Sequence, residues 1–467
     1  MVLLKSSSSP SIVFKVRRNP AELVAPAGPT PHELKLLSDI DDQQTLRIFY
    51  FPAVQFFPCQ PSMAGKDPVH VIREALSKAL VFYYPLAGRL REGPTGKLMV
   101  DCTAQGVLFI EADADVTLDQ FGVDLLPPFP CSHELLYDAP LFSNDGIINS
   151  PLMLIQVTRL KCGGFIFAMR VNHTMCDASG IFLFIKGIAE IAQGAAKPSI
   201  MPVWCRDLLC ARDPPTVTCL HPEYQQQALH DYESPSFKCC HASFFFGPKH
   251  IHALRHLLPD DLAQSSSTFD VLTAFLWRSH TAALHWQNPN QEVLLMCTVN
   301  ARFEPCRLNP PLPEGYYGNA LVFPAVVSTV GMLCGQPLSY ALELSKKPKK
   351  DATEEYVHST ADLMATKGRP ALSLRRSFIV SNLSKFELSD VDYGWGKPLY
   401  FGPYKAGIDD IPGVSYYLPY TNSKGEHGTV VLICLPEDAM KRFENEINGI
   451  LHIKVEDKPI SSIMSNL

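Results

Sequence analysis

Apolar and polar residues alternate from Phe165 to Val171, and an apolar-rich run follows from Ile181 to Ala192. Alternation with a period of two is typical of a β-strand, whereas a longer run with helical spacing is typical of a buried helix. We therefore expect a strand that ends at Asn172 and a helix that begins near Asp177. The stretch His173–Asp177 would connect the two elements.

The same patterns predict further strands and helices in the N-terminal half. Asp67 precedes Pro68, and a capping carboxylate before a proline in the first turn is typical of a helix start. A hairpin should precede His173, because two alternating runs flank Cys162-Gly163-Gly164. The expected strands of this half are Ile12–Val16, Lys97–Cys102, Val107–Ala112, Leu154–Leu160 and Phe165–Val171.

The C-terminal half repeats this mixture of elements. Its expected elements are a strand at Ala242–Phe246, a helix at Pro248–Leu258, a helix at Phe269–Trp277 and a strand at Val293–Val299. Strands that alternate with helices predict an α/β fold. Helical periodicity stops between Gly194 and Pro215, where prolines recur. We therefore predict one domain over residues 1–215, a crossover linker over 216–236 and a second domain over 237–467.

Composition narrows the class of protein. The chain has 467 residues, of which 46% are hydrophobic and 19% charged, so we expect an ordinary soluble protein with two domains. A net charge of -6 argues against a nucleic-acid partner. We expect no membrane partner either, because no apolar stretch reaches the ~20 residues of a membrane span.

Cysteine and histidine usage does not indicate a metal site. The 14 cysteines are scattered, and the N-terminus lacks the apolar core of a signal peptide, so we expect free thiols in the cytosol. His252 and His256 would share a helical face, but no C-x2-C pair accompanies them to complete a tetrahedral zinc site. We therefore predict no metal ligands.

His173 is the candidate general base. A titratable imidazole at the carboxyl end of a strand, just before a helix, occupies a position where α/β proteins tend to place reactive groups. Three other interpretations remain open at this point. His173 could be a structural residue, it could form a dyad with Asp177 four residues on, or it could activate Cys176 as a thiol nucleophile.

Two short motifs resemble signatures of a known family. His173-Thr174-Met175-Cys176-Asp177 resembles the HxxxD motif of the plant BAHD acyltransferases, and Asp392-Tyr393-Gly394-Trp395-Gly396 resembles their DFGWG motif, with Tyr393 in place of phenylalanine. The segments Leu37–Asp42 and Tyr84–Leu90 extend the similarity. Within the family, the chain is most similar to benzyl alcohol O-benzoyltransferases and related alcohol acyltransferases.

The resemblance implies a fold and a reaction. The fold would consist of two similar mixed-sheet domains of the chloramphenicol-acetyltransferase type, with a tunnel at their interface. His173 would act as base in direct transfer of an acyl group from coenzyme A to an alcohol, which yields an ester and free coenzyme A. Acyl-CoA would be a co-substrate, with no permanently bound cofactor, and we expect a monomer.

The resemblance also suggests structural roles around this base. Asp177 would pair with Arg302, which follows a strand of the other domain, and would not relay protons. Asp392, Gly394, Trp395 and Gly396 would form a structural turn away from the reacting atoms. The pairing of Asp177 with Arg302 agrees with elementary electrostatics, because a buried carboxylate needs a charged or hydrogen-bonded partner.

Substrate-binding candidates come from three further segments. Ser267 and Thr268 open a predicted helix, and helix N-termini bind phosphate groups, so they are candidates for coenzyme A contact. Tyr316 and Asn319 belong to a loop that resembles the family's P-E-G-Y-x-G-N stretch, and they are candidates for the substrate pocket. Leu383 and Ser384 are also pocket candidates, because the resemblance implies that their segment lies near the tunnel. Family members often have a bulky aromatic at the place of Leu383, so the smaller residue would widen the pocket.

Substrate identity stays open within this chemistry. We favour a benzoyl or similar aromatic acyl group, with two alternatives: an alkaloid or other complex alcohol as acceptor, or an aliphatic acyl-CoA as donor. An acyl-enzyme on Cys176 and a non-catalytic acyl-CoA-binding protein are the remaining readings. We expect a cytosolic protein, although Ser465-Asn466-Leu467 is a variant of the peroxisomal S-K-L signal.

Overall fold

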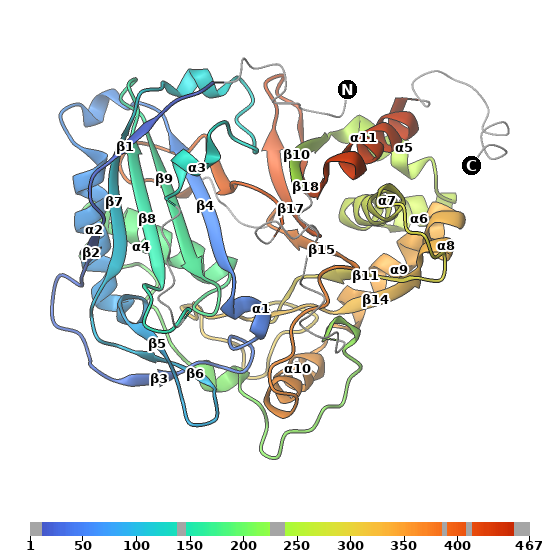
Figure 1. The fold of residues 1–467 in the computed structure, drawn as a ribbon, viewed down its shortest axis with the longest axis horizontal. Coiled ribbons are helices and arrows are strands. Elements are labelled where there is room, and N and C mark those ends of the chain that lie inside the picture. The colour runs from blue at the N-terminus through green and yellow to red at the C-terminus, as the bar shows by residue number, and fades with distance from the viewer. Residues whose placement is uncertain (1–11, 138–145, 225–238, 385–389, 408–412, 453–467) are drawn as a thin grey trace.

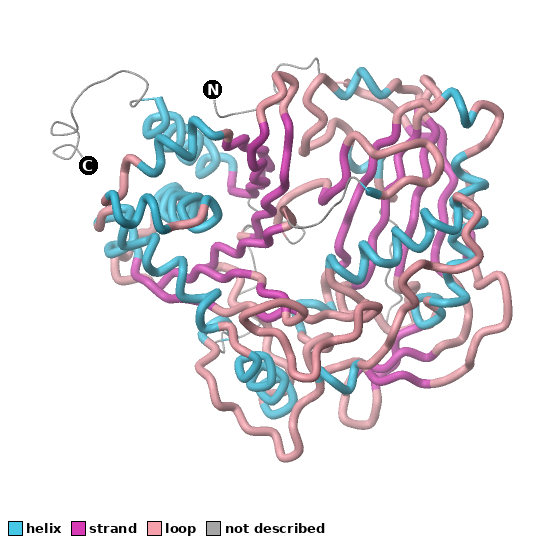
Figure 2. Tube along the Cα trace, turned by 180° about the vertical axis from the view of Figure 1, so that it is seen from behind, coloured by secondary structure: helices cyan, strands magenta, loops and turns pink. Residues whose placement is uncertain are grey.

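A computed structural model describes residues 12–137, 146–224, 239–384, 390–407 and 413–452 of the chain. Two β-sheets form separate lobes that face each other across a seam (Figure 1). The helices α2 (Pro68–Phe82) and α4 (Ala178–Ala192) pack together in the first lobe. Seen from behind, helices of both lobes cover the outer faces of the strands (Figure 2).

The first sheet has seven strands within the described residues, in the order β1-β7-β8-β9-β4-β16, with β2 paired to β7. Strands β7 and β8 run parallel, and the other neighbours are antiparallel. Their bounds are β1 Val16–Arg18, β2 Glu22–Val24, β4 Tyr50–Phe57, β7 Val107–Ala114, β8 Met153–Arg159, β9 Phe165–Asn172 and β16 Tyr400–Pro403.

The second sheet has six strands within the same described ranges, in the order β10-β18-β17-β15-β11-β14. Strand β15 runs parallel to both β11 and β17. The strand bounds are β10 Cys239–Phe246, β11 Glu292–Cys297, β14 Ala325–Thr329, β15 Ser377–Asn382, β17 Val414–Thr421 and β18 His427–Pro436. The similar mixed-sheet construction of both lobes agrees with the predicted fold class.

Short strands and the remaining helices complete the two lobes. The short strands are β3 Leu34–Leu36, β5 Arg89–Glu92 and β6 Leu98–Asp101, which form one sheet, and β12 Val299–Asn300 with β13 Leu321–Val322. The other helices are α1 Gln44–Arg47, α3 Ser132–Leu135, α5 Pro248–Arg255, α6 Asp260–Ser265, α7 Thr268–Ala283, α8 Val330–Gly335, α9 Leu338–Asp351, α10 Glu354–Thr366 and α11 Glu437–His452. None of the helices within the described residues combines the length and apolar character that crossing a membrane requires.

Helix and strand signals read from the sequence agree closely in several places. Asp67 caps α2, where its side chain accepts a hydrogen bond of 3.1 Å from the Val69 amide. The hairpin before His173 is present as β8 and β9. The edge strand expected at Ile12–Val16 begins only at Val16, where pairing with Ala114 of β7 starts.

The contiguous division into residues 1–215 and 237–467 is wrong in one respect. Strand β16 belongs to the first sheet, because Tyr400–Pro403 pairs antiparallel with β4. Apolar residues from both lobes, such as Val54 and Leu418, also belong to one continuous core. The C-terminal half therefore returns a segment to the first lobe, which a contiguous boundary cannot represent. Much of the predicted linker, residues 225–236, lies outside the described residues.

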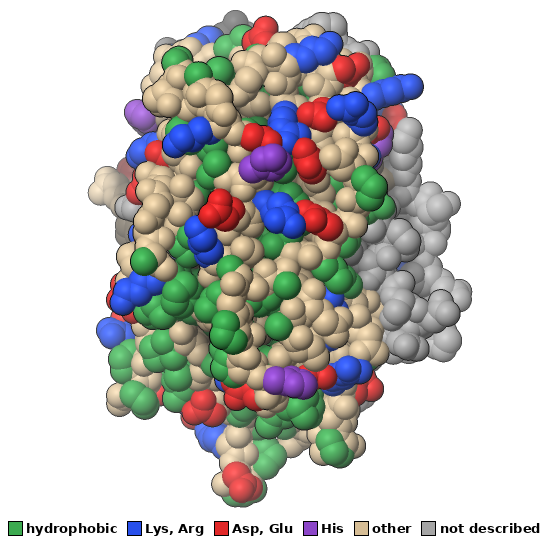
Figure 3. Space-filling model, turned by 90° about the vertical axis from the view of Figure 1, so that its left-hand side faces the viewer, with side chains coloured by type: hydrophobic (Ala, Val, Ile, Leu, Met, Phe, Trp, Pro, Cys, Tyr) green, Lys and Arg blue, Asp and Glu red, His purple; other side chains and the backbone are tan. Residues whose placement is uncertain are grey.

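The surface on the β1, β2 and α2 side of the first lobe carries acidic and basic side chains close together (Figure 3). Arg159 of β8 bridges three carboxylates near this side, with nitrogen to oxygen distances of 2.5 Å to Asp67, 2.6 Å to Glu111 and 3.3 Å to Asp113. Their partial exposure means that solvent screens these pairs, so each contributes little to stability.

Candidate active site

The loop between β9 and α4 brings His173 and Asp177 to the seam. Asp177 is the N-cap of α4, and its side chain accepts a hydrogen bond of 3.0 Å from the Gly180 amide, which has no partner within the helix. Glycine is needed at position 180, because a Cβ atom there would lie 1.9 Å from the Tyr317 carbonyl oxygen. The start of α4 is therefore pressed against a loop of the second lobe.

His173 is held through its backbone and by two aromatic rings. Its amide donates to the Phe49 carbonyl at 2.9 Å. The Phe49 ring stacks on the imidazole with a centroid distance of 5.7 Å, and Phe51 meets it edge-on at 6.1 Å. The residue keeps partial solvent exposure. It lies at the seam, because Phe51 also contacts Tyr416 of β17 in the second lobe.

Asn319 determines which ring nitrogen of His173 carries the proton. The His173 Nδ1 lies 3.1 Å from the Asn319 Oδ1, while the Asn319 Nδ2 donates to the His173 carbonyl at 2.7 Å and to the Asp41 carboxylate at 2.9 Å. Because the amide nitrogen faces two acceptors, the amide oxygen must face Nδ1. Nδ1 then donates the hydrogen bond, and Nε2 keeps the lone pair that a base requires.

Burial sets the charge state of the two titratable groups in this loop. Burial lowers the pKa of His173 below its ordinary value of 6.5, while the hydrogen bond to its own backbone, the Asp177 charge, Asn319 and Asp41 act in the opposite direction. The imidazole is therefore neutral at neutral pH. Burial also raises the pKa of the Cys176 thiol far above its usual value of 9.0. A buried neutral thiol is a poor nucleophile, which argues against an acyl-enzyme on Cys176.

Asp177 is fully engaged with groups other than the imidazole. Its Oδ2 accepts from Arg302 Nη1 at 2.6 Å and from the Ala320 amide at 3.0 Å. Arg302 also donates to the carbonyls of Tyr316, at 3.0 Å, and Gly318, at 2.7 Å. The Asp177 hydrogen bonds of the described residues go to Gly180, Arg302 and Ala320, and none goes to His173, which disfavours the dyad.

The segment Asp392–Gly396 forms a tight turn against the first sheet. Asp392 Oδ1 accepts from the Gly394 amide at 2.6 Å and the Gly396 amide at 2.8 Å, and both glycines have positive φ, 107° and 81°. The Trp395 ring meets Phe165 at 5.3 Å. Phe165 opens β9 and His173 follows its end, so the two lie about 25 Å apart along the strand.

Two of the predicted pocket residues, Tyr316 and Asn319, are packed in the protein interior and line no pocket among the described residues. The side chains of Tyr316 and Asn319 are fully buried, with 0% exposure. The Tyr316 hydroxyl donates to the Asn319 carbonyl at 3.2 Å, and its ring faces the guanidinium groups of Arg206 and Arg302. The prediction that these residues line a substrate pocket is therefore wrong, because hydrogen bonds and packing occupy both side chains.

Leu383 and Ser384 differ in exposure. Leu383 is 6% exposed and belongs to the core near the seam, whereas Ser384 is exposed and its amide donates to Asn382 Oδ1 at 3.0 Å. The residues that follow, 385–389, lie outside the described residues. A pocket role for Leu383 and Ser384 therefore stays a prediction.

The coenzyme A candidates occupy the start of α7. The Ser267 hydroxyl caps the helix by accepting from the Asp270 amide at 3.1 Å, and it donates to the Asp270 carboxylate at 2.6 Å. Lys349 pairs with Asp270, so the charge that would repel a phosphate is compensated. The basic run Lys346–Lys350 lies within α9. Thr268 lines a cavity of about 380 Å³ together with Arg255 and His252.

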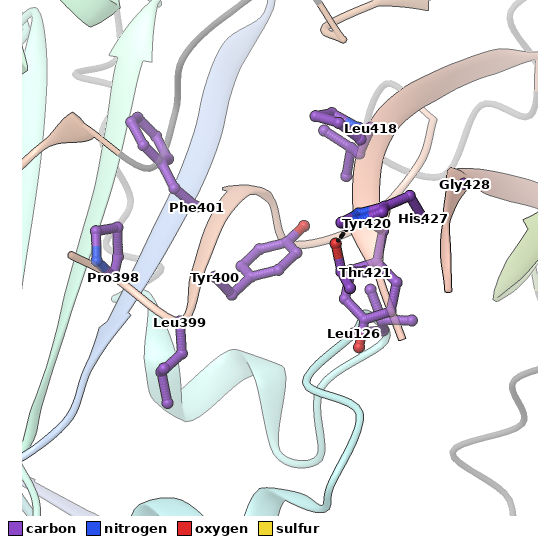
Figure 4. Close-up of a pocket in the computed structure, with 11 residues that line it drawn as sticks. Leu126, Pro398, Leu399, Tyr400, Phe401, Leu418, Tyr420, Thr421, His427 and Gly428 are labelled. Atoms are coloured by element: carbon purple, nitrogen blue, oxygen red, sulfur yellow. Dashed lines mark hydrogen bonds between the residues drawn. The ribbon is translucent and has the colours of Figure 1, made fainter. Parts of the chain in front are cut away.

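A second described cavity, of about 440 Å³, lies at the seam of the two lobes. Figure 4 shows Leu399 and Tyr400 on the β16 side and Leu418, Tyr420 and Thr421 on the opposite side. A hydrogen bond of 2.8 Å joins Thr421 to His427 at its rim. Alternation along β17 places Leu418 on the same face as Tyr416 two residues earlier, so this face links the cavity to the surroundings of His173.

Two groups of side chains could attract a metal ion. The Nε2 atoms of His252 and His256 lie 2.9 Å apart on the exposed side of α5. Asp67, His70 and Glu111 place their ligand atoms within 4.8 Å of one another. Arg159 already occupies both of these carboxylates. We assign a metal to neither group.

Sequence reasoning missed the residues that surround the imidazole from other elements. Phe49 and Phe51 come from β4 and its start, and Asp41 and Arg206 stand behind Asn319. For Asp41, the signal was the similarity of Leu37–Asp42 to the family, which does not say what Asp41 contacts. Arg206 lies in a proline-rich stretch without any recognisable motif.

Comparisons with a family model and with known proteins indicate similarity to transferases, and a comparison with solved structures indicates a similar fold. The family model described as "Transferase family" matches residues 14–449. The chain is 59% identical to 13-hydroxylupanine O-tigloyltransferase of Lupinus albus, covering 96% of this chain and 97% of the relative. It is 54% identical to benzyl alcohol O-benzoyltransferase of Nicotiana tabacum, covering 98% of each. The fold is similar, with a TM-score of 0.64 and 18% identity, to the crystal structure of F. graminearum TRI101 complexed with coenzyme A and deoxynivalenol, covering 88% of this chain and 97% of that one.

Proposed function

Because this chain belongs to the BAHD family of acyltransferases, we propose that it transfers an acyl group directly from an acyl-CoA to an alcohol, with His173 as general base. The observation that carries this proposal is the imidazole at the seam, whose Nδ1 is held by the Asn319 side chain. The coenzyme A in the TRI101 structure supports a coenzyme A thioester as donor.

The names of the relatives limit the classes of acyl donor and alcohol acceptor to consider, but they do not identify one donor and acceptor for this chain. One is named for a benzoyl group and benzyl alcohol, and the other for a tigloyl group and 13-hydroxylupanine. Both transfer an acyl group to oxygen, as their names state. We keep benzoyl-CoA as the first donor to test, and we include tigloyl-CoA and other aliphatic donors, together with hydroxylated alkaloids, as alternatives.

The proposed reaction uses the free Nε2 of His173. An alcohol is a weak nucleophile until a base accepts its proton, and imidazole titrates close to neutral pH. Nε2 would take the hydroxyl proton while the oxygen attacks the thioester carbonyl. The resulting imidazolium would return the proton to the sulfur of coenzyme A as the thioester bond breaks. General base assistance of this kind contributes about 10²–10⁴ in rate.

Two neighbouring cavities support a route for coenzyme A from the start of α7 to the seam. The seam cavity shares a face of β17 with Tyr416, which contacts Phe51 beside His173. The neighbouring cavity contains Thr268 and the cationic Arg255, and His427 lines both cavities. We propose that the start of α7, with Ser267 and Thr268, binds the phosphate end of coenzyme A while the thioester reaches His173.

The test is a substrate screen followed by a matched pair of variants. The purified full chain is mixed with benzoyl-, tigloyl- and acetyl-CoA, each combined with benzyl alcohol and a set of complex alcohols, and esters are detected by mass. We expect His173→Ala to lower kcat by about 10²–10⁴ at unchanged melting temperature. Cys176→Ala should keep kcat within a few-fold, because the thiol takes no part.

Two outcomes would overturn the proposal. Near-normal kcat in His173→Ala would remove the base, and loss of turnover in well-folded Cys176→Ala would favour an acyl-enzyme. A protein that only binds acyl-CoA would release no free thiol with any alcohol in the screen. Release of coenzyme A thiol that depends on added alcohol would exclude that alternative.

A further inference from the structure

A buried carboxylate stands directly behind the partner of the catalytic histidine. Asp41 is fully buried, and its Oδ1 accepts from the Asn319 backbone amide and from the Asn319 Nδ2, each at 2.9 Å. The same Asn319 side chain meets the His173 Nδ1 at 3.1 Å. An amide therefore lies between the imidazole and a carboxylate that the sequence places more than a hundred residues earlier.

Donors fix Asp41 on all sides. Arg206 Nη1 donates to Oδ1 at 2.6 Å, while the Ser38 amide and hydroxyl donate to Oδ2 at 3.1 Å and 2.6 Å. With the two bonds from Asn319, five donors meet one carboxylate, and each of these groups supplies a hydrogen. This arrangement fits an ionised carboxylate, because a protonated one would need to donate a hydrogen of its own.

Arg206 connects the carboxylate to the loop that carries His173. Its Nη2 donates to the Met175 carbonyl at 2.7 Å, and its guanidinium lies 4.4 Å from the centre of the Trp204 ring. The side chain is 2% exposed. The ion pair of Asp41 and Arg206 thus holds Asn319 on one side and the His173 loop on the other.

The carboxylate also fixes the direction of the Asn319 amide. A flipped amide would turn its oxygen toward the Asp41 Oδ1 and the His173 carbonyl, and both of these are acceptors. The amide oxygen would then leave Nδ1, which would lose its acceptor. Asp41 therefore decides the tautomer of an imidazole that it does not touch.

We propose that Asp41 is a positioning residue for the reaction, which acts through Asn319 to keep His173 in its Nδ1-protonated tautomer and to stabilise the imidazolium. The neutral amide relays the orientation and part of the charge of Asp41. Asp177 has a different task, because its carboxylate is engaged with Arg302 across the seam. This inference rests on the proposed role of His173 as base.

Other titratable or charged groups near His173 must be included in any pH argument. They are Asp177 at the start of α4, Cys176 in the loop, Arg302 after β12, and Arg206 with Asp41 behind Asn319. Arg302 neutralises Asp177 in the same way that Arg206 neutralises Asp41. Of these groups, all within the described residues, only the Asp41 pair reaches the ring through a hydrogen-bonded side chain, Asn319.

The experiment measures pH profiles of kcat/KM for the full chain and for Asp41→Asn. Without the carboxylate the imidazolium is less stable, so the acid limb should move to lower pH by about half a unit or more. We expect kcat to fall about tenfold or more with KM within threefold, since a positioned base acts in the transition state. Asp39→Asn is the matched control, because Asp39 is buried in the same segment but pairs with Lys97.

A double-mutant cycle separates this role from a structural one. If Asp41 acts through Asn319, then Asp41→Asn combined with Asn319→Ala should be no slower than Asn319→Ala alone. Additive losses, or an acid limb that does not move in Asp41→Asn, would overturn the proposal. An acid limb that moves equally in Asp39→Asn would do the same.

Two additions keep the result decisive. If Asp41→Asn fails to fold because Arg206 loses its partner, the paired variant Asp41→Asn with Arg206→Gln removes both charges together and is measured instead. His173→Ala is measured in parallel. An active His173→Ala would reject the proposed function, whereas an inactive His173→Ala with an unmoved limb in the Asp41 variant would reject only this inference.

Discussion

The segments His173–Asp177 and Asp392–Gly396 each contain an aspartate with the same local hydrogen-bonding pattern, but the two aspartates have different structural roles. Each carboxylate accepts hydrogen bonds from backbone amides that follow it in the chain. The Asp177 carboxylate also accepts from Arg302 and Ala320 of the second lobe. The Asp392 bonds with Gly394 and Gly396 stay within their own turn.

This difference separates a residue that joins two lobes from one that shapes a loop. The first segment carries a half-buried imidazole whose environment comes from β4, from Asn319 and from Asp41. The second places the large Trp395 against Phe165 at the far end of β9. Two motifs that are equally visible in a sequence can therefore differ in role: one joins the lobes around the proposed base, and the other packs a loop.

Breaking the lobe contact should have the largest effect. Asp177→Ala leaves the largely buried Arg302 without its carboxylate, and breaking a buried pair costs about 3–5 kcal/mol in the free energy of unfolding. Activity should fall as well, because the loop that holds His173 loses its anchor. Denaturant unfolding and kcat measured on the same preparation check this expectation.

The Arg302 partner provides the control for this prediction. Asp177→Leu combined with Arg302→Met replaces the pair by apolar groups and should lose less stability than the two single variants added together. Additive losses would mean that the pair contributes nothing beyond its separate contacts.

Breaking the turn should have a smaller effect, confined to stability. Asp392→Ala removes two hydrogen bonds to a charged group, which corresponds to a loss of about 1–3 kcal/mol. We expect kcat to stay within twofold, because the turn lies at the other end of β9. The exposed pair of Asp390 and Lys397 is the matched control, and Asp390→Asn should change stability by about 0–1 kcal/mol. A large fall in kcat for folded Asp392→Ala would break the comparison.

A change of pH should have the smallest effect on the difference between the two segments. Burial lowers the pKa of His173 in the folded protein below its ordinary value of 6.5. Folding stability from the neutral ring is thus fully present above pH 6.5 and is lost as pH falls through the folded pKa. Activity should fall over the same range, because the base becomes protonated.

The turn segment offers the contrast for this measurement. Its side chains are of types that do not titrate near neutral pH. The acid limb of kcat/KM should therefore lie below pH 6.5 in the unmodified chain and stay within 0.3 units in Asp392→Ala. A limb above pH 7 would contradict the assignment of His173 as the base.

Much of the local structure follows from residue patterns. The alternation before His173, the run after Asp177 and the capping Asp67 each correspond to an element within one or two residues. These signals are local, because hydrogen bonds within a helix and side-chain alternation along a strand depend on near neighbours. Local preference is not decisive everywhere: Pro348 lies inside α9, although proline usually ends a helix.

The pattern of apolar and polar residues did not predict which segments far apart in the chain lie next to each other. Strand β16 joins the first sheet although it follows most of the second lobe in the chain, because its backbone pairs with β4. Tyr316 and Asn319 belong to a recognisable loop, yet their side chains face inward to the ion pairs and the imidazole. The pairing of Asp177 with Arg302 came from the family resemblance and not from spacing.

By itself, the sequence determined the strand, the loop and the helix that present His173, since each depends on contacts between residues close in the chain. Only the tertiary structure decided what surrounds that ring: Phe49 on its face, Asn319 at Nδ1, and Asp41 with Arg206 behind. These groups come from segments far apart in the chain, and they meet because two lobes bury their polar groups against each other. A buried polar group is stable when it has a hydrogen-bond partner, and that partner is a neighbour in the folded structure that need not be close in the sequence.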